Sequence, residues 1–504
     1  MAEFIDLVTR SLEDATRREF DRRVDEQADR LIEALQAGRL DSPSFGLGIE
    51  LEAYAVDADG RLARVPEDVF DGHCDKELGV HNVEFNTEPT RFDGDGIAAG
   101  AAALRRDYRN AQQAADRAGG AIVLDAMWTI PPSNGSHAYL AAVDESEGMT
   151  IAENMTPSPR YCAIDNDVLA RTGGSVTLSV PGVERRFPSI LFESLTSSIQ
   201  PHVQIPDVEE FSRYHNTAVG TLGPVLALAT NSPLLPPDLY DIDDPGRLLE
   251  ETYHELRIPV FEQSINGAWE KVRFPEKIRR TAATIDRLRA DPTCAPFLQE
   301  WVGDGDRETF PDLFWELNHK RGTYWRWLRT VVGGQPVEQG DRWSIRIEYR
   351  PLPTQPTIVE NVGLQCLVAG LVHGLCAVGH PLATLDRDVA ERSFYDAVEN
   401  GLDADLAWVT VDGDRTTDSA VIYDELFGFA RRGLREQGVP ADTIEDYLAP
   451  LEARWTDRVT PSQWKLERVR DRLEAGLDFD EAVFEMQTEY VDRSTSGEPV
   501  AQWS

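Results

Sequence analysis

The chain has 504 residues, 41% of them hydrophobic, which is typical of a globular protein with a large core and excludes a disordered chain. Its 88 Asp and Glu outnumber its 50 Lys and Arg, so the formal net charge is −38, and nucleic acid is excluded as the expected partner because phosphate backbones require a basic face. The acidic residues are spread along the whole chain and only five basic residues are lysines, which we interpret as adaptation to high salt, with a specific cationic partner as the alternative.

The first third of the chain predicts two helices and three strands. Helical spacing of apolar residues covers 4–37, and residues 45–65 alternate and turn at 57–60, as in a β-hairpin. A second alternating strand covers 80–89. Residues 95–118 predict a helix, and 121–128 predict the next strand.

The rest of the chain adds fewer strands and more helices. Strands are predicted at 175–180, 197–205 and 342–352. Asp207 is the predicted N-cap of a helix that runs to residue 230. Helical patterns continue from 358 to about 380 and, with breaks, from 385 to 492. Because strands and helices do not alternate strictly, the pattern favours an α+β fold with an antiparallel sheet, and neither a P-loop nor a Rossmann glycine motif is present.

The cysteines and the apolar segments bear on the compartment. The five cysteines are widely spaced and include no C-x-x-C, so they indicate neither a disulfide framework nor a zinc site. The N-terminal residues are charged and lack an apolar signal core. The most apolar run, 359–378, is interrupted by polar residues and is interpreted as a buried helix. We therefore expect a cytoplasmic, reduced protein with no membrane partner.

Three predicted strands each place carboxylates on one face, because successive strand residues point to opposite sides. These sets are Glu50 and Glu52; Asn82, Glu84, Asn86 and Glu88; and Arg346, Glu348 and Arg350. Mg²⁺ prefers carboxylate oxygens and guanidinium groups bind phosphate oxygens. A carboxylate-bound metal cluster beside such arginines is what phosphoryl transfer requires. For any single strand, the alternative is an exposed face of solvated glutamates.

Several short motifs, in this order, make the chain similar to the glutamate–cysteine ligase family in its type-2 bacterial and archaeal branch. They are Gly48-Ile49-Glu50-Leu51-Glu52, Glu77-Leu78-Gly79, Glu84-Phe85-Asn86-Thr87, the strand 198–204, the Asn231-Ser232-Pro233 turn, Arg257 and the strand 346–350. The strand 198–204 departs from the family pattern, since it carries His202 and Gln204 where relatives often have two histidines.

The resemblance implies a glutamine-synthetase-like catalytic fold, with a curved antiparallel sheet packed with helices. It implies an ATP-dependent carboxylate–amine ligase that joins glutamate to an amine, by default cysteine, through an acyl phosphate, as in glutathione biosynthesis. Mg²⁺, or Mn²⁺ in its place, would be held by Glu50, Glu52, Glu84 and Glu348. ATP would contact His202, Gln204, Arg346 and Arg350, the two arginines acting in catalysis. The amino acid would contact Asn86, Thr87, Asn231 and Arg257.

The chain is expected to comprise an N-terminal helix (1–40), a catalytic domain (41–380) and a helical C-terminal extension (381–504). Whether it forms a homo-oligomer is left open by the sequence. His202 is alternatively a structural histidine, and Arg350 is alternatively the ion-pair partner of a nearby glutamate. Alternative functions are a ligase for another amine, a guanidino kinase, and a non-catalytic protein that binds an amino acid or nucleotide.

Overall fold

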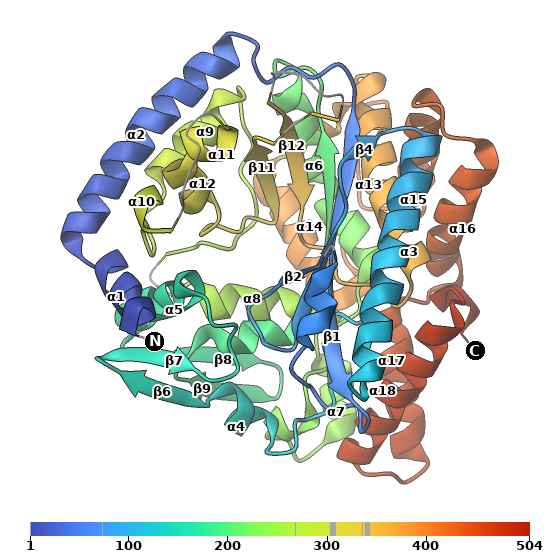
Figure 1. Ribbon diagram of the computed structural model, residues 1–504. Helices are drawn as coiled ribbons and strands as arrows, with labels where there is room; N and C mark the ends of the chain where they lie inside the picture. The colour runs from blue at the N-terminus through green and yellow to red at the C-terminus, as the bar shows by residue number, and fades with distance from the viewer. Residues whose placement is uncertain are drawn as a thin grey trace.

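An antiparallel sheet runs through the middle of the protein (Figure 1). The computed structural model describes residues 2–72, 74–267, 269–302, 309–334, 336–337 and 343–503. Strand order is β11-β12-β10-β1-β3-β2, and β4 and β5 also pair with β1. The strands are β1 (Gly46–Asp57), β2 (Cys74–Lys76), β3 (Asn82–Asn86), β4 (Thr90–Arg91), β5 (Gly120–Val123), β10 (Ile199–Gln204), β11 (Leu328–Val332) and β12 (Ile345–Tyr349). The predicted α+β class with an antiparallel sheet is confirmed.

Three two-stranded sheets lie outside the main sheet. They are β6 (Val143–Ser146) with β7 (Met149–Ala152), β8 (Val176–Val180) with β9 (Val183–Phe187), and β13 (Trp408–Val409) with β14 (Arg415–Thr416).

Helices cover both faces of the main sheet (Figure 1). On the right in the view, the sheet is flanked by α3 (Gly94–Arg117), α13 (Ile358–Ala377), α15 (Ser419–Glu436) and α16 (Ala441–Asp457). On the left lie α2 (Asp14–Gln36), α5 (Pro159–Thr172), α9 (Ala282–Ala290) and α12 (Trp315–Arg321). The other helices are α1 (Ala2–Ser11), α4 (Ser136–Leu140), α6 (Phe211–Ala229), α7 (Pro245–Glu251), α8 (Arg257–Ile265), α10 (Gln299–Val302), α11 (Phe310–Leu313), α14 (Arg387–Asn400), α17 (Pro461–Glu474) and α18 (Phe479–Ser496).

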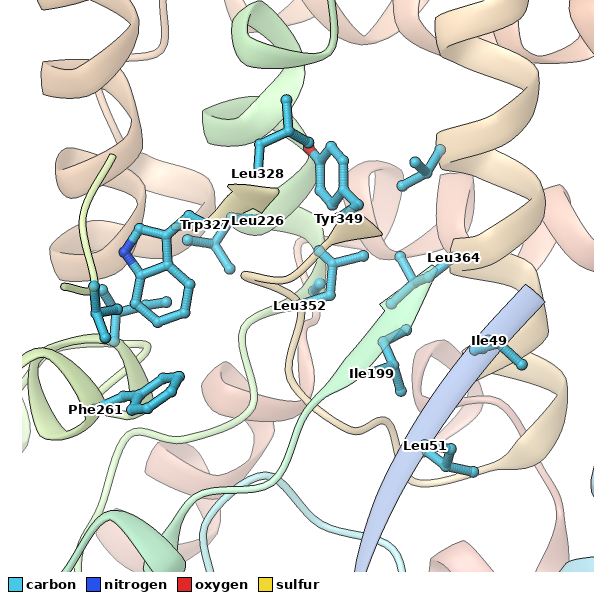
Figure 2. Packing of buried hydrophobic residues seen from close by; sticks show 14 of the residues in the cluster. Ile49, Leu51, Ile199, Leu226, Phe261, Trp327, Leu328, Tyr349, Leu352 and Leu364 are labelled. Carbon is cyan, nitrogen blue, oxygen red and sulfur yellow. The ribbon is translucent and has the colours of Figure 1, made fainter. Parts of the chain in front are cut away.

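The apolar face of the sheet packs against α13 and α6. Ile49 and Ile199 point to this face, as does Tyr349 of β12, and Figure 2 shows them with Leu364 of α13 and Leu226 of α6. All five side chains are almost completely buried. Because one face of each strand is committed to this core, the alternate residues must point to the opposite, polar face.

Within the described residues, α13 is the one helix that is long and apolar enough to cross a membrane. In its most apolar window, 89% of the residues are buried inside the protein, as in a core helix. The interpretation of the run 359–378 as a buried helix is therefore confirmed.

Two predicted helix boundaries are wrong. The N-terminal segment is not one helix, because the chain turns at Leu12 and Glu13 between α1 and α2. The Glu13 backbone is extended (φ −72°, ψ 140°), which interrupts the helical hydrogen bonds. Asp207 accepts a hydrogen bond from the Glu209 N–H (2.8 Å) in a turn, and α6 begins only at Phe211.

One hydrophobic core extends from α1 to α16, and a smaller one lies around Trp464 and Tyr490 in α17 and α18. The first core crosses residue 380, where the sequence predicts a domain boundary. A Cβ atom at Gly370 of α13 would lie only 2.6 Å from the Ala430 carbonyl oxygen of α15, so the two helices approach closely across that boundary. The division into three parts stays a prediction.

Candidate active site

Strand pairing brings the predicted polar residues together on one face. β1 pairs with β3 so that Glu52 lies opposite Glu84, and β10 pairs with β12 so that His202 lies opposite Glu348. Arg329 of β11 is also opposite Glu348. The register thus joins five strands into one polar surface, which agrees with the alternation in the sequence.

The larger part of this surface lines a cavity of about 350 Å³, the central cavity. Its acidic residues are Glu50, Glu52, Glu77, Glu84 and Glu193. Its arginines are Arg160, Arg257, Arg321, Arg329 and Arg350. Apolar and aromatic side chains complete the wall, among them Tyr161, Phe261 and Trp325. A concave site with both signs of charge and an apolar wall suits a small zwitterionic or anionic ligand.

A second cavity of about 440 Å³, the side cavity, lies along the ends of β1, β3, β10 and β12. Its polar lining includes Asn86, Thr87, His202, Gln204 and Arg346. Glu50 lines both cavities. The two cavities therefore meet at a carboxylate.

The contact between the cavities is a short polar chain. His202 Nε2 lies 3.0 Å from Glu50 Oε1, and Arg346 Nε donates to His202 Nδ1 (3.1 Å). Burial opposes the ionisation of Glu50, but its interaction with His202 outweighs burial, and the pKa of Glu50 falls below its ordinary value. Glu50 is therefore an anion in this site.

Glu348 is neutralised by the protein itself. Arg329 donates to its Oε2 through Nη2 (2.8 Å) and Nε (3.1 Å), and Arg350 Nη1 donates to Oε1 and to Gln200. Although burial opposes ionisation, these two cations hold the pKa of Glu348 well below its usual range. Glu348 is thus a fixed anion with two arginines attached.

The remaining carboxylates of the central cavity have no such cations. Burial raises the pKa of Glu77 to about 7, and the nearby Glu52 adds to the shift. Burial and the neighbouring glutamates also raise the pKa of Glu84 and of Glu193 well above the ordinary range. For Glu52 the pKa is raised by burial although Ser198 N–H donates to it (2.7 Å). These four groups repel one another when ionised.

The carboxylates of the central cavity are chemically suited to bind a divalent cation. Attraction between each carboxylate and the cation would replace the repulsion among the buried carboxylates. Within the described residues, however, no three His, Cys, Asp or Glu side chains converge on a common point suited to a metal. Binding therefore requires rotation of side chains such as Glu50 and Glu84. Of the predicted metal residues, Glu50, Glu52 and Glu84 line the central cavity, whereas Glu348 lies behind its arginines.

The structure separates the residues that the resemblance assigns to the amino acid. Arg257 lines the central cavity, with Nε 3.4 Å from Glu255. Asn86 and Thr87 line the side cavity instead, beside the residues assigned to ATP. Arg350 lines the central cavity rather than the side cavity, and so it is divided from Arg346.

Asn231 lines neither cavity. Its side-chain amide nitrogen donates to the Thr354 carbonyl (2.7 Å) and to the Tyr490 hydroxyl of α18 (2.9 Å). Its backbone carbonyl accepts from Lys465 Nζ (2.9 Å). The side chain is completely buried. Asn231 thus fastens the end of α6 to the C-terminal helices, and the structure does not bring it to a substrate.

Besides Arg329 of β11, sequence reasoning missed four charged residues of the central cavity: Glu77, Glu193, Arg160 and Arg321. Glu77 was within a motif but had no assigned role, and strand alternation offers no signal for the other three. They lie on a 3₁₀ helix (Ile190–Leu195) and on α5 and α12. Only the folded chain brings these elements to the sheet.

Asp165 holds the 3₁₀ helix that carries Glu193. It accepts hydrogen bonds from Ser189 Oγ (2.9 Å) and Ile190 N–H (2.9 Å), and burial raises its pKa to about 7. Because this folded-state pKa exceeds the ordinary 3.8, unfolding releases a proton between these pH values, and the contribution of Asp165 to stability is lost as pH rises through about 7. Relative to the wild type, Asp165→Asn should gain melting temperature as pH rises from 5 to 8.

Asp167, which lies on α5 with Asp165, is the matched control for this prediction. Its Oδ1 lies 2.9 Å from Arg171 Nη2, and although burial opposes ionisation, this bond holds its pKa below the ordinary 3.8. Asp167→Asn should therefore change the melting temperature by the same amount at every pH from 5 to 8. Parallel pH profiles for wild type and Asp165→Asn would contradict the prediction.

Solved structures with a similar fold include the glutamate–cysteine ligase gshA from Francisella tularensis in complex with AMP, with a TM-score of 0.52, 14% identity, and 91% of this chain and 90% of that chain covered. A bifunctional glutathione synthetase from Pasteurella multocida gives 0.49 at 12% identity, covering 93% and 55% of the two chains. The ligase PafA, solved in complex with the ubiquitin-like protein Pup, gives 0.38 at 10% identity, covering 89% and 74%. No curated protein matches the chain.

The antiparallel sheet, with its polar face and two adjoining cavities, suits an ATP-dependent carboxylate–amine ligase, and the family match supports this class. The family model of glutamate–cysteine ligase family 2 matches residues 46–496, and the chain belongs to this family. The match includes most of the C-terminal helices and begins at the first residue of β1.

Proposed function

We propose that the protein forms a γ-glutamyl amide from glutamate and an amine, with cysteine as the default amine, and converts ATP to ADP and phosphate. The observation that carries the proposal is Glu50, which lines both cavities. A nucleotide in the side cavity and a carboxylate substrate in the central cavity would meet there. In that arrangement a phosphoryl group needs to travel only across the contact between the cavities.

In this proposal the side cavity holds ATP. Arg346, His202 and Gln204 contact the nucleotide, and Asn86 and Thr87 lie on the same side. Glutamate occupies the central cavity, where Arg257 binds a substrate carboxylate and Arg350 faces the acyl group. Glu50, Glu52 and Glu84, with Glu348 behind them, would hold Mg²⁺ or Mn²⁺. When bound, the ion neutralises phosphate charge during transfer.

The chemistry proceeds in two displacements. An oxygen of the glutamate side-chain carboxylate attacks the γ-phosphorus, and the bond to ADP breaks, which gives an acyl phosphate. The amine nitrogen then attacks the acyl carbon, phosphate leaves with the former carboxylate oxygen, and the nitrogen loses a proton. The arginines of the central cavity offset the negative charge in both steps.

A phosphate-release assay with purified protein, ATP, Mg²⁺, glutamate and a panel of amines tests this function. We expect inorganic phosphate and ADP only when glutamate and an accepted amine are both present at turnover. A guanidino kinase would produce ADP without inorganic phosphate. A sensor would bind the same ligands with no turnover, and either result would refute the proposal.

The net charge of −38 adds a prediction for the assay conditions. We expect the protein to work in a salt-rich cytoplasm, because screening weakens repulsion among its acidic residues. Melting temperature and turnover should both rise as KCl is increased from about 0.1 M toward molar levels. Highest stability in dilute buffer would refute salt adaptation and favour a cationic partner instead.

A further inference from the structure

Arg321, the last residue of α12, lies in the wall of the central cavity, and its side chain has no partner among the residues that the structure describes. In the described structure its guanidinium forms no hydrogen bond or ion pair, and its Nε is buried without a partner. The chain contains 88 acidic residues against 50 basic ones, so carboxylates are abundant. An arginine left unpaired beside a cavity in such a protein indicates that an anion from outside fills its place.

The other arginines near the strand face are held by the protein. Arg329 and Arg350 bind Glu348, and Arg346 binds His202 and the Gly333 carbonyl (3.0 Å). Arg160 donates to the Gly322 carbonyl. Arg321 is therefore the arginine of this group whose two terminal nitrogens are both uncommitted within the described residues.

Residues of both cavities are among the electrostatic neighbours of Arg321. Arg329 of the central cavity and Arg346 of the side cavity oppose its charge, and Glu348 and Glu50 favour it. Burial is the largest influence and lowers the pKa of Arg321 to about 9, so the guanidinium remains charged at neutral pH. Arg321 itself lines the central cavity together with Glu50, the carboxylate that lines both cavities.

We propose that Arg321 binds the phosphoryl group while it passes from ATP to the substrate carboxylate, an inference that rests on the proposed ligase function. During this step one phosphorus–oxygen bond to ADP breaks and one to the carboxylate forms, while negative charge stays on the three other oxygens. The planar guanidinium offers two N–H groups to two of these oxygens. Arg321 is then a catalytic residue, and its binding partner is present only during the reaction.

Another anion site is the alternative. Arg321 also lines a smaller cavity of about 70 Å³ together with Arg287 and His215. Within the part of the chain that the structure describes, His215 Nδ1 is buried without a partner, and Arg287 Nη2 donates to the Lys277 carbonyl (2.7 Å). A small anion held there would engage Arg287 as well as Arg321. Arg287 does not line the central cavity, so it serves as the matched control.

The direct test measures capture of ADP with aluminium fluoride and Mg²⁺, a mimic of the transferring phosphoryl group, by calorimetry. We expect Arg321→Gln to weaken this capture by on the order of 10²-fold and to change the affinity for ADP alone less than about threefold. Arg321→Lys keeps the positive charge but loses the planar guanidinium with its paired N–H groups. Its affinity for the mimic should lie between those of the wild type and Arg321→Gln. Arg287→Gln should match the wild type.

Positional isotope exchange in ATP labelled at the β–γ bridging oxygen, with glutamate and no amine, reports the same step in the reaction. We expect the exchange rate to fall in both Arg321 variants and to stay unchanged in Arg287→Gln.

Two outcomes would overturn the proposal. Equal losses of capture in the Arg321 and Arg287 variants would assign the anion to the small cavity, and unchanged capture in the Arg321 variants would make Arg321 a structural residue. Wild-type capture without glutamate-dependent phosphate release would instead refute the ligase function alone.

Discussion

Glu50→Gln is expected to lower the turnover number by on the order of 10²-fold or more, at saturating ATP and glutamate. Glu50 lines both cavities and is an anion whose Oε1 lies 3.0 Å from His202 Nε2. The amide removes the charge that would attract a divalent cation to the contact between the cavities, so half-saturation by Mg²⁺ should also rise. Folding should be maintained, because the amide oxygen still accepts from His202.

Glu184→Gln is a matched control for this variant. Glu184 is an exposed glutamate on β9, outside both cavities. It should leave the turnover number, the Mg²⁺ requirement and the melting temperature at wild-type values. Near-normal turnover of Glu50→Gln beside this control would remove Glu50 from the metal site.

The residues that lie on the polar face of the sheet could be predicted from the sequence. Strict alternation in 48–52, 82–88 and 345–350 requires Glu50, Glu84 and Glu348 to oppose the apolar core, whatever the register. The antiparallel class followed from the short turn at 57–60. Register itself depends on how strands far apart in the chain meet, and it decides that Glu348 faces Arg329 and His202.

The division of this face into two cavities could not be predicted. Arg346 and Arg350 are four residues apart on one strand face, yet they line different cavities. The central cavity is completed by α5, α12 and the 3₁₀ helix 190–195, which contribute Arg160, Arg321 and Glu193 through tertiary packing alone. Asn231 shows the reverse case, since a residue that the resemblance assigns to the substrate binds Tyr490 inside the protein instead.

Glu348 and its arginines differ physically from the other carboxylates. Glu348 is already neutralised by Arg329 and Arg350. Burial instead raises the pKa values of Glu52, Glu77, Glu84 and Glu193, and neighbouring glutamates add to the shift for the last three. A cation should therefore be drawn to the second group before Glu348. Metal binding there would displace protons and so strengthen as pH rises through about 7, near the pKa of Glu77.

Arg350→Lys should lower the turnover number by on the order of 10²-fold and change the affinity for ATP less than about threefold. Arg350 lines the central cavity and not the side cavity, so it would face the acyl group rather than the bound nucleotide. Its Nη1 is shared between Glu348 and Gln200, and its Nε is buried without a partner. Lysine keeps the charge but cannot reach Glu348, Gln200 and a substrate oxygen together.

The competing role for Arg350 is that of an ion-pair partner that only supports Glu348. Steady-state kinetics and the melting temperature of Arg350→Lys, measured beside Arg329→Lys, separate the two roles. Arg329 binds the same carboxylate from β11, at 2.8 Å, so both variants weaken the pair to Glu348 and should lower the melting temperature alike. A larger loss of turnover in Arg350→Lys than in Arg329→Lys is expected, because all three side-chain nitrogens of Arg329 donate to Glu348 or to the Arg321 carbonyl, whereas Arg350 donates to Glu348 and Gln200 through Nη1. If the two variants have equally lowered melting temperatures and the folded fraction of Arg350→Lys keeps the wild-type turnover number, Arg350 has a structural role alone.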